Sequence, residues 1–215
     1  MRLSILPFLA LSALPVFADQ YSLTVDTCTG TCGASPFGVV EVVQNGANTV
    51  HVEISLTNVN LFILTGNRPT VGFNLVGNPT IAISNVTLGF SLVSTTAGAL
   101  FMNGALGSFE YGLNCCEGKN GGANAQGGLE FDVTAPGLTP AAFAELSTGA
   151  NTPSYFAVDI FNIGDTQNTG VVGAPGRTTG TPGVVPEPGS VILLSTTFVL
   201  CGYLLRRRGL GARLS

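Results

Sequence analysis

The segment Thr49–Leu56 alternates strictly between apolar and polar residues, and this period of two requires an extended strand. Its apolar residues fall on one face and its polar residues on the other, as in a strand that is buried on one side only. Similar alternation recurs in three further stretches, at 21–26, 109–113 and 129–134. Two more continuously apolar stretches, Gly38–Gln44 and 156–163, are typical of central strands.

The alternation changes phase at two places. Within 81–92 the apolar residues move from odd to even positions, so we expect a bulge or a tight turn near Ser84-Asn85. A second slip lies near Thr57-Asn58. Phase changes of this kind suit strands that bend or pass from one sheet of a sandwich to the other.

Composition supports the same fold class. The 215 residues include 29 glycines and 12 prolines, and only 9% are charged, where an ordinary soluble domain has about 25%. So few charges and so many turn-forming residues exclude a protein built of long helices. Charge-driven disorder is excluded because 45% of the residues are hydrophobic, which is enough to build a core. We predict an all-β fold, an antiparallel and jelly-roll-like β-sandwich. One short helix is expected at 140–146, with Thr139 as its N-cap and Pro140 as its first residue.

Residues 1–18 have the features of a secretory signal peptide. Arg2 supplies the positive charge at the start, and residues 3–16 are nearly all apolar. The small residue Ala18 ends the segment, so signal peptidase is expected to cut between Ala18 and Asp19.

Residues 190–205 are free of charge and precede Arg206-Arg207-Arg208. As a helix they would extend about 24 Å at roughly 1.5 Å per residue, close to the ~30 Å of a hydrocarbon core. We predict a single transmembrane helix that contains Cys201, with the three arginines as a membrane stop on the cytoplasmic side.

Between these ends, we predict an ectodomain at 19–164 and a flexible linker rich in Gly, Thr and Pro at 165–184. All 12 acidic residues but only three basic ones lie between Asp19 and Gly189, which gives this part a net charge near −9. A nucleic-acid partner is excluded, because a surface that binds phosphates needs clustered Lys and Arg.

The motif Val185-Pro186-Glu187-Pro188, together with the apolar stretch and the arginines after it, resembles the PEP-CTERM protein-sorting signal of exopolysaccharide-producing Gram-negative bacteria. The resemblance covers 185–209. It implies that an exosortase, a membrane cysteine protease, recognises Pro186-Glu187-Pro188. The chain would then pass through the inner membrane to the cell envelope, the outer surface or the extracellular matrix.

The ectodomain is also similar to a group of uncharacterised PEP-CTERM proteins, whose biochemistry is not established. Five short segments carry this resemblance: Gly72-Phe73-Asn74-Leu75, Gly89-Phe90-Ser91-Leu92, Phe109-Glu110-Tyr111-Gly112, Phe131-Asp132-Val133-Thr134 and Tyr155-Phe156-Ala157-Val158-Asp159-Ile160. The C-terminal module is also described on ice-binding proteins, which suggests a second class of function.

Four cysteines lie in the exported part, namely Cys28, Cys32, Cys115 and Cys116, and an oxidising compartment favours disulfides. We favour bonds between each of the first two and one of the last two, and a bond between Cys28 and Cys32 remains open. A zinc site is the alternative. Adjacent cysteines suit tetrahedral ligation poorly, so no metal cofactor is expected.

The polar candidates for chemistry are few. Glu130 and Asp132 share one face of a strand, and with Glu110 on a neighbouring strand they could hold Ca²⁺ or form a glycosidase pair. We favour a solvated outer face as the explanation for these carboxylates. His51 is the only histidine, and no Gly-x-Ser-x-Gly sequence marks a nucleophile for it.

These features predict an exported, non-enzymatic protein with a structural or adhesive role, without a cofactor. Its expected partners are signal peptidase, an exosortase, the membrane before processing, and exopolysaccharide. A carbohydrate-binding module of the matrix is one alternative, although the chain has no Trp and only four Tyr to stack on sugars. An ice-binding protein is the other, although no Thr-x-Thr array recurs.

Overall fold

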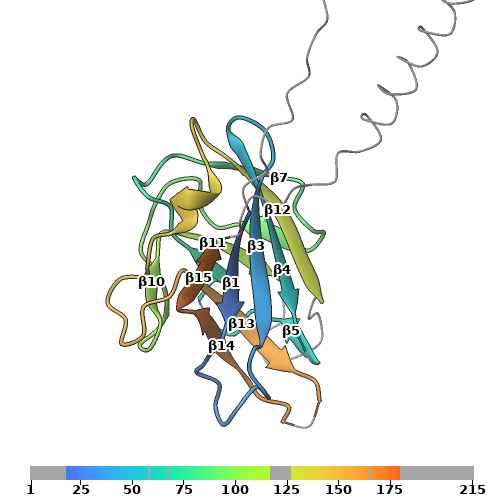
Figure 1. The fold of residues 1–215 in the computed structure, drawn as a ribbon. Coiled ribbons are helices and arrows are strands. Elements are labelled where there is room, and N and C mark those ends of the chain that lie inside the picture. Colours follow the sequence, from blue (N-terminus) through green and yellow to red (C-terminus); the bar gives the residue numbers. More distant parts are fainter. Residues whose placement is uncertain (1–17, 58, 67, 117–126, 165, 180–215) are drawn as a thin grey trace, which may run out of the picture. The chain divides into compact units, whose positions relative to one another are not determined.

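The computed structural model describes residues 18–57, 59–66, 68–116, 127–164 and 166–179 (Figure 1). Within these residues every paired strand is antiparallel, and the one helix is a short 3₁₀ turn. The predicted all-β, antiparallel class is therefore confirmed. The proposed signal peptide (apart from Ala18), sorting motif, membrane helix and arginine stop lie outside the described residues. In the described part, no helix has the length and apolarity needed to cross a membrane.

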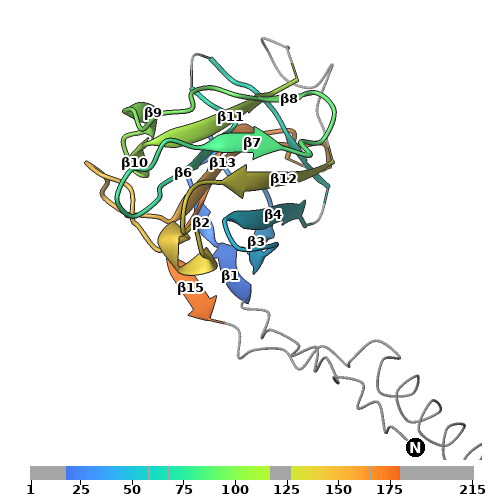
Figure 2. The same cartoon turned by 90° about the horizontal axis from the view of Figure 1, so that it is seen from above.

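The strands form two large sheets and one separate hairpin. Figure 2 shows the six-stranded sheet, whose strands follow in the order β15 (Gly176–Thr179), β1 (Ala18–Leu23), β3 (Gly38–Gln44), β4 (Thr49–Leu56), β12 (Gly128–Thr134) and β7 (Ala82–Ser84). The seven-stranded sheet has the order β2 (Val25–Asp26), β14 (Thr169–Ala174), β13 (Phe156–Asn162), β6 (Val71–Phe73), β11 (Tyr111–Cys115) and β8 (Phe90–Leu92), and β5 (Asn60–Phe62) also pairs with β13. The hairpin joins β9 (Leu100–Asn103) to β10 (Gly107–Phe109).

The inner faces of the two large sheets share one hydrophobic core, so the architecture is sandwich-like. Phe73 lies at its centre and is fully buried. Its ring contacts Phe131 of the six-stranded sheet, Tyr111 and Phe156 of its own sheet, and Phe143 of the 3₁₀ turn, with centroids 5.5–6.2 Å apart. These aromatic rings fasten the two sheets together.

Both phase changes in the sequence coincide with a change of sheet. After Thr57, the chain leaves β4 in the six-stranded sheet and enters β5 in the seven-stranded one. After Ser84 it passes from β7 in the six-stranded sheet to β8 in the seven-stranded one, in the same direction across the sandwich. Asn85 turns the backbone there with a φ of 52°, in the left-handed region that Asn tolerates better than most residues. The predicted break near Ser84-Asn85 is therefore confirmed.

The predicted helix is shorter than expected and of a different type. A 3₁₀ turn spans Pro140–Phe143, and Thr139 makes no side-chain cap. Tertiary contacts stop it from continuing, because the Leu146 carbonyl accepts a hydrogen bond from Asn74 Nδ2 at 2.8 Å. The Ser147 amide donates to the Ser154 carbonyl at 2.9 Å.

The predicted linker is wrong for its described residues, 166–179. They contain β14, which forms a hairpin with β13, and β15, which pairs with β1 at the edge of the other sheet. Val171 and Val172 are fully buried. The pairing is fixed further by Arg177, whose Nη2 lies 2.7 Å from Asp19 Oδ2. The folded unit therefore extends at least to Thr179.

The cysteines form disulfides as predicted, but the favoured pairing between the two groups is wrong. Cys28 bonds to Cys32, and Cys115 bonds to Cys116. Asp26 curls the first loop, because its carboxylate accepts hydrogen bonds from the amides of Cys28 and Cys32 at 2.8 and 3.2 Å. Cys116 has a φ of 38°, so the backbone turns directly after β11. Each cysteine therefore meets its near neighbour in the chain, and thiolates for a zinc site are not present in these four residues.

Candidate functional site

A row of small residues crosses the outer face of the seven-stranded sheet. Gly112, Gly72, Ala157 and Gly173 stand side by side on β11, β6, β13 and β14. A Cβ atom on Gly72 would lie 2.9 Å from the ring of Phe109, and one on Gly173 would lie 2.7 Å from Leu106. The row is therefore a shallow channel that larger side chains would fill.

The β9–β10 hairpin occupies this channel. Its residues Met102, Leu106 and Phe109 form a second, smaller hydrophobic cluster with Ala157 and Val171. Asn103 holds the turn, since its Oδ1 accepts hydrogen bonds from the amides of Ala105 and Leu106. The Asn103 Nδ2 donates to Thr27 Oγ1 at 2.6 Å. The hairpin is thus a third layer, fixed at its base and at its turn.

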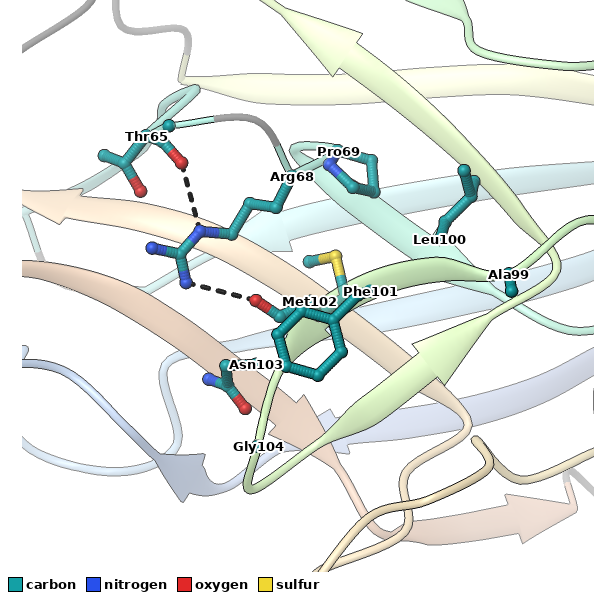
Figure 3. A pocket seen from close by; sticks show the side chains of 10 residues that line it. Thr65, Arg68, Pro69, Ala99, Leu100, Phe101, Met102, Asn103 and Gly104 are labelled. Carbon is teal, nitrogen blue, oxygen red and sulfur yellow. Dashed lines mark hydrogen bonds between the residues drawn. The ribbon is translucent and has the colours of Figure 1, made fainter.

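A cleft of about 580 Å³ opens between this hairpin and the segment before β6 (Figure 3). One wall consists of Thr65, Gly66, Arg68 and Pro69, and the other consists of residues 99–104. Its volume lies within the ~300–1,000 Å³ range of small-molecule sites.

Arg68 joins the two walls of the cleft. Its Nε donates to the Thr65 carbonyl at 3.0 Å on its own wall, and its Nη1 donates to the Met102 carbonyl at 3.2 Å on the other. The side chain keeps 32% of its surface exposed. The guanidinium is therefore held in one orientation, at the end of a side chain that is partly exposed.

Behind Arg68 lies Asp159, on the central strand β13 and fully buried. Its Oδ2 accepts hydrogen bonds from the amide and the hydroxyl of Thr65 at 2.7 and 2.5 Å, and it lies 4.0 Å from Arg68 Nε. Its Oδ1 is buried and has no partner among the described residues. Burial raises the pKa of Asp159 to about 6, although the bonds from Thr65 and the charge of Arg68 act in the opposite direction.

The other wall presents an aromatic ring to solvent. Phe101 is 59% exposed, while the next residue, Met102, is only 2% exposed. Because side chains alternate along β9, Met102 packs against the outer face of the seven-stranded sheet and Phe101 points away from it. Figure 3 shows the Arg68 guanidinium against the Met102 carbonyl, with the ring of Phe101 next to it along the strand. A cation and an exposed aromatic ring therefore border the same cleft, and this combination makes it the candidate binding site.

His51 has a carboxylate partner on the outer face of the other sheet. Its Nδ1 lies 2.8 Å from Asp132 Oδ1, across the β4–β12 pair. Burial disfavours the charged form of Asp132, but hydrogen bonds from Asn85, His51 and Asn45 outweigh it and lower its pKa. Among the described residues no serine, threonine or cysteine side chain bonds to the His51 ring, so the pair has no nucleophile there.

The predicted Ca²⁺ trio is not assembled. Glu130 and Asp132 share a face of β12 in the six-stranded sheet, as expected. Glu110 lies between β10 and β11, away from the six-stranded sheet. Its amide donates a hydrogen bond to Asn74 Oδ1 at 2.8 Å. Phe109 and Tyr111 therefore belong to separate strands rather than to the single strand that the sequence indicated, and the three carboxylates do not meet.

Among the described residues, the one group of three potential metal ligands within 4.8 Å of one another is Asp26, Cys28 and Cys32. Both sulfurs are in a disulfide, and the Asp26 carboxylate accepts hydrogen bonds from the loop around it. The group therefore closes a loop and does not offer thiolate ligands.

None of the cleft's features was predicted from the sequence. Arg68 stood out only as one of three basic residues between Asp19 and Gly189, inside a turn-forming cluster. Asp159 was a stronger indication of a polar site, because a carboxylate in the apolar stretch 156–163 needs a polar partner when the strand is buried. Phe101 carried no signal, because its exposure depends on how the hairpin docks.

Comparison of the chain with protein-family models, with curated proteins and with solved structures finds no match in any of the three. The fold and the cleft define an all-β protein with a candidate binding cleft on the outer face of one sheet.

Proposed function

We propose that this chain is an exported, non-enzymatic envelope or matrix protein that adheres to polysaccharide through the Arg68–Phe101 cleft. The observation that carries the adhesive role is the exposed ring of Phe101 in a concave site. An aromatic face packs against the apolar C–H face of a sugar ring, and polar groups around it fix the orientation. The proposal keeps a jelly-roll-like sandwich as the fold class, an architecture that also builds lectin domains.

Export and sorting rest on the two ends of the chain. The resemblance of 185–209 to a PEP-CTERM signal supports cleavage by an exosortase, and residues 1–18 support cleavage by signal peptidase. The two cuts leave the folded unit nearly whole, since β1 begins at Ala18, the last residue before the first cut, and β15 ends at Thr179, before the second. The C-terminal apolar stretch serves as a membrane helix before processing.

The sorting proposal predicts that replacing Pro186, Glu187 and Pro188 by Ala blocks processing. The unprocessed chain should accumulate in the inner membrane, because the protease no longer recognises its site. Cell fractionation and the mass of the mature protein measure this. A variant with Thr181 and Pro182 replaced by Ala should be processed normally. Unchanged mass and location of the triple variant would contradict the proposal.

The adhesive proposal predicts that Phe101→Ala weakens glycan binding about tenfold or more, as expected for an aromatic anchor. A glycan array probed with the purified mature protein measures this. Leu88→Ala is the matched control, because Leu88 is 93% exposed and lies outside the cleft. It should bind like the parent protein. Arrays that stay blank for the parent protein would rule out the adhesive role.

Ice binding needs a flat, regular array of threonines. The cleft is concave and carries an arginine and an aromatic ring, so no observation favours this alternative over adhesion.

A further inference from the structure

The charge balance of the described residues makes Arg68 unusual. These residues include nine carboxylates and two arginines. The other arginine, Arg177, is held by Asp19 at 2.7 Å on the edge strand. Among the described carboxylates, the oxygen nearest to Arg68 belongs to Asp159, at 4.0 Å, and Arg68 borders the cleft. The cleft therefore offers a positive group on a domain that is otherwise acidic.

The guanidinium has donors to spare. Arginine carries five N–H groups, and Arg68 uses one at Nε and one at Nη1 for the two cleft walls. Its other N–H groups, all on the two Nη atoms, have no hydrogen-bond acceptor among the described residues. Asp159 lies on the Nε side, so it does not occupy the Nη edge. An edge of this kind binds a carboxylate with parallel hydrogen bonds.

The position of Arg68 is fixed before any ligand arrives. The Thr65 and Met102 carbonyls hold it from both walls, and Asn103 and the channel of small residues hold the hairpin that supplies Met102. A fixed side chain loses little conformational entropy on binding, which favours affinity. Phe101 directly precedes Met102, so the open ring lies one residue from the carbonyl that holds the guanidinium.

We propose that the cleft selects acidic sugars, with Arg68 binding the carboxylate of a uronic acid residue while Phe101 packs against its pyranose ring. This inference rests on the proposed adhesive function and deepens it by naming the ligand class. In a uronic acid the carboxylate is attached directly to the ring, so the two groups require a cation and an aromatic face close together.

The test compares three oligosaccharides of equal length, namely hexagalacturonate, its methyl ester and cellohexaose, by titration calorimetry on the mature protein. The parent protein should bind hexagalacturonate about tenfold to a hundredfold tighter than the ester, as expected for a charge-assisted hydrogen bond. The comparison of acid and ester needs no variant, so it does not depend on whether a substituted protein folds.

Arg68→Gln should remove this preference by weakening the acid and leaving the ester unchanged. Arg177→Gln is the matched control, because it makes the same change of charge away from the cleft, and it should keep the preference. Equal binding of acid and ester, or a preference that survives Arg68→Gln, would overturn the inference while leaving adhesion intact. Failure of the parent protein to bind any of the three, together with blank glycan arrays, would overturn both.

Discussion

Replacing Phe73 by Ala is expected to lower the free energy of unfolding by about 3–5 kcal/mol, the largest stability effect that we predict for a single side chain. Phe73 is fully buried and contacts four aromatic rings that come from both sheets and the 3₁₀ turn. Its removal leaves a cavity that these rings cannot close without moving both sheets. Equilibrium unfolding in urea, followed by tyrosine fluorescence and circular dichroism, measures the change.

Phe101→Ala is the matched control for this substitution. It deletes the same atoms from a ring that is 59% exposed, so the expected change is within about 0.5 kcal/mol. A cost below about 1 kcal/mol for Phe73→Ala, or equal costs for the two variants, would show that Phe73 does not fasten the sheets together. The pair also separates folding from binding, because only Phe101 is assigned to the ligand.

The strands were predictable wherever one face of the strand is buried and the other is exposed to solvent. Thr49–Leu56 is strand β4 with the predicted bounds, and its apolar residues Val50, Val52 and Ile54 are fully buried. The two phase changes were equally informative. A strand that moves to the opposite sheet must present its other face to the same core, so the sequence pattern has to slip by one residue.

The C-terminal strands were not predictable from composition. Residues 166–179 are rich in Gly and Thr, which is typical of a tether, yet β14 and β15 complete both sheets. Small residues are required here by packing. A Cβ on Gly170 would lie 2.4 Å from the backbone of Cys28, and Gly173 makes room for Leu106. The same glycines that suggested flexibility are therefore what allow close packing.

The cleft depends on contacts between distant parts of the chain, and this is why its residues escaped prediction. Arg68 and Phe101 come from separate segments, and they border one cleft only because the β9–β10 hairpin lies over the seven-stranded sheet. No periodicity in the sequence reports how a hairpin docks on a sheet. The disulfide pairing depends instead on local turns: Asp26 curls the loop that joins Cys28 to Cys32, and the backbone turns at Cys116, beside Cys115.

Replacing Asp159 by Asn is expected to stabilise the protein at neutral pH by up to about 3 kcal/mol, the free-energy equivalent of the rise in its pKa from 3.8 to about 6. Below pH about 4, Asp159 is protonated in both the folded and the unfolded states. Between pH 4 and 6 the unfolded chain releases this proton while the folded protein retains it, so stability falls as pH rises. Above pH 6 the buried carboxylate is ionised, and its cost stays constant.

Asn keeps an oxygen that accepts the two hydrogen bonds from Thr65, and it never ionises. The difference between variant and parent should therefore be largest at pH 7 and should close as the pH falls to 4, when both are unfolded in urea at each pH. Asp132→Asn provides a control of opposite sign. The pKa of Asp132 is lowered, so its charged form stabilises the fold, and the variant should be less stable than the parent at pH 7. A difference for Asp159→Asn that is unfavourable at pH 7 and independent of pH would mean that Asp159 is ionised without cost. Its carboxylate would then be fully compensated by Arg68 and Thr65, and the arginine would be less available to a ligand than the cleft geometry implies.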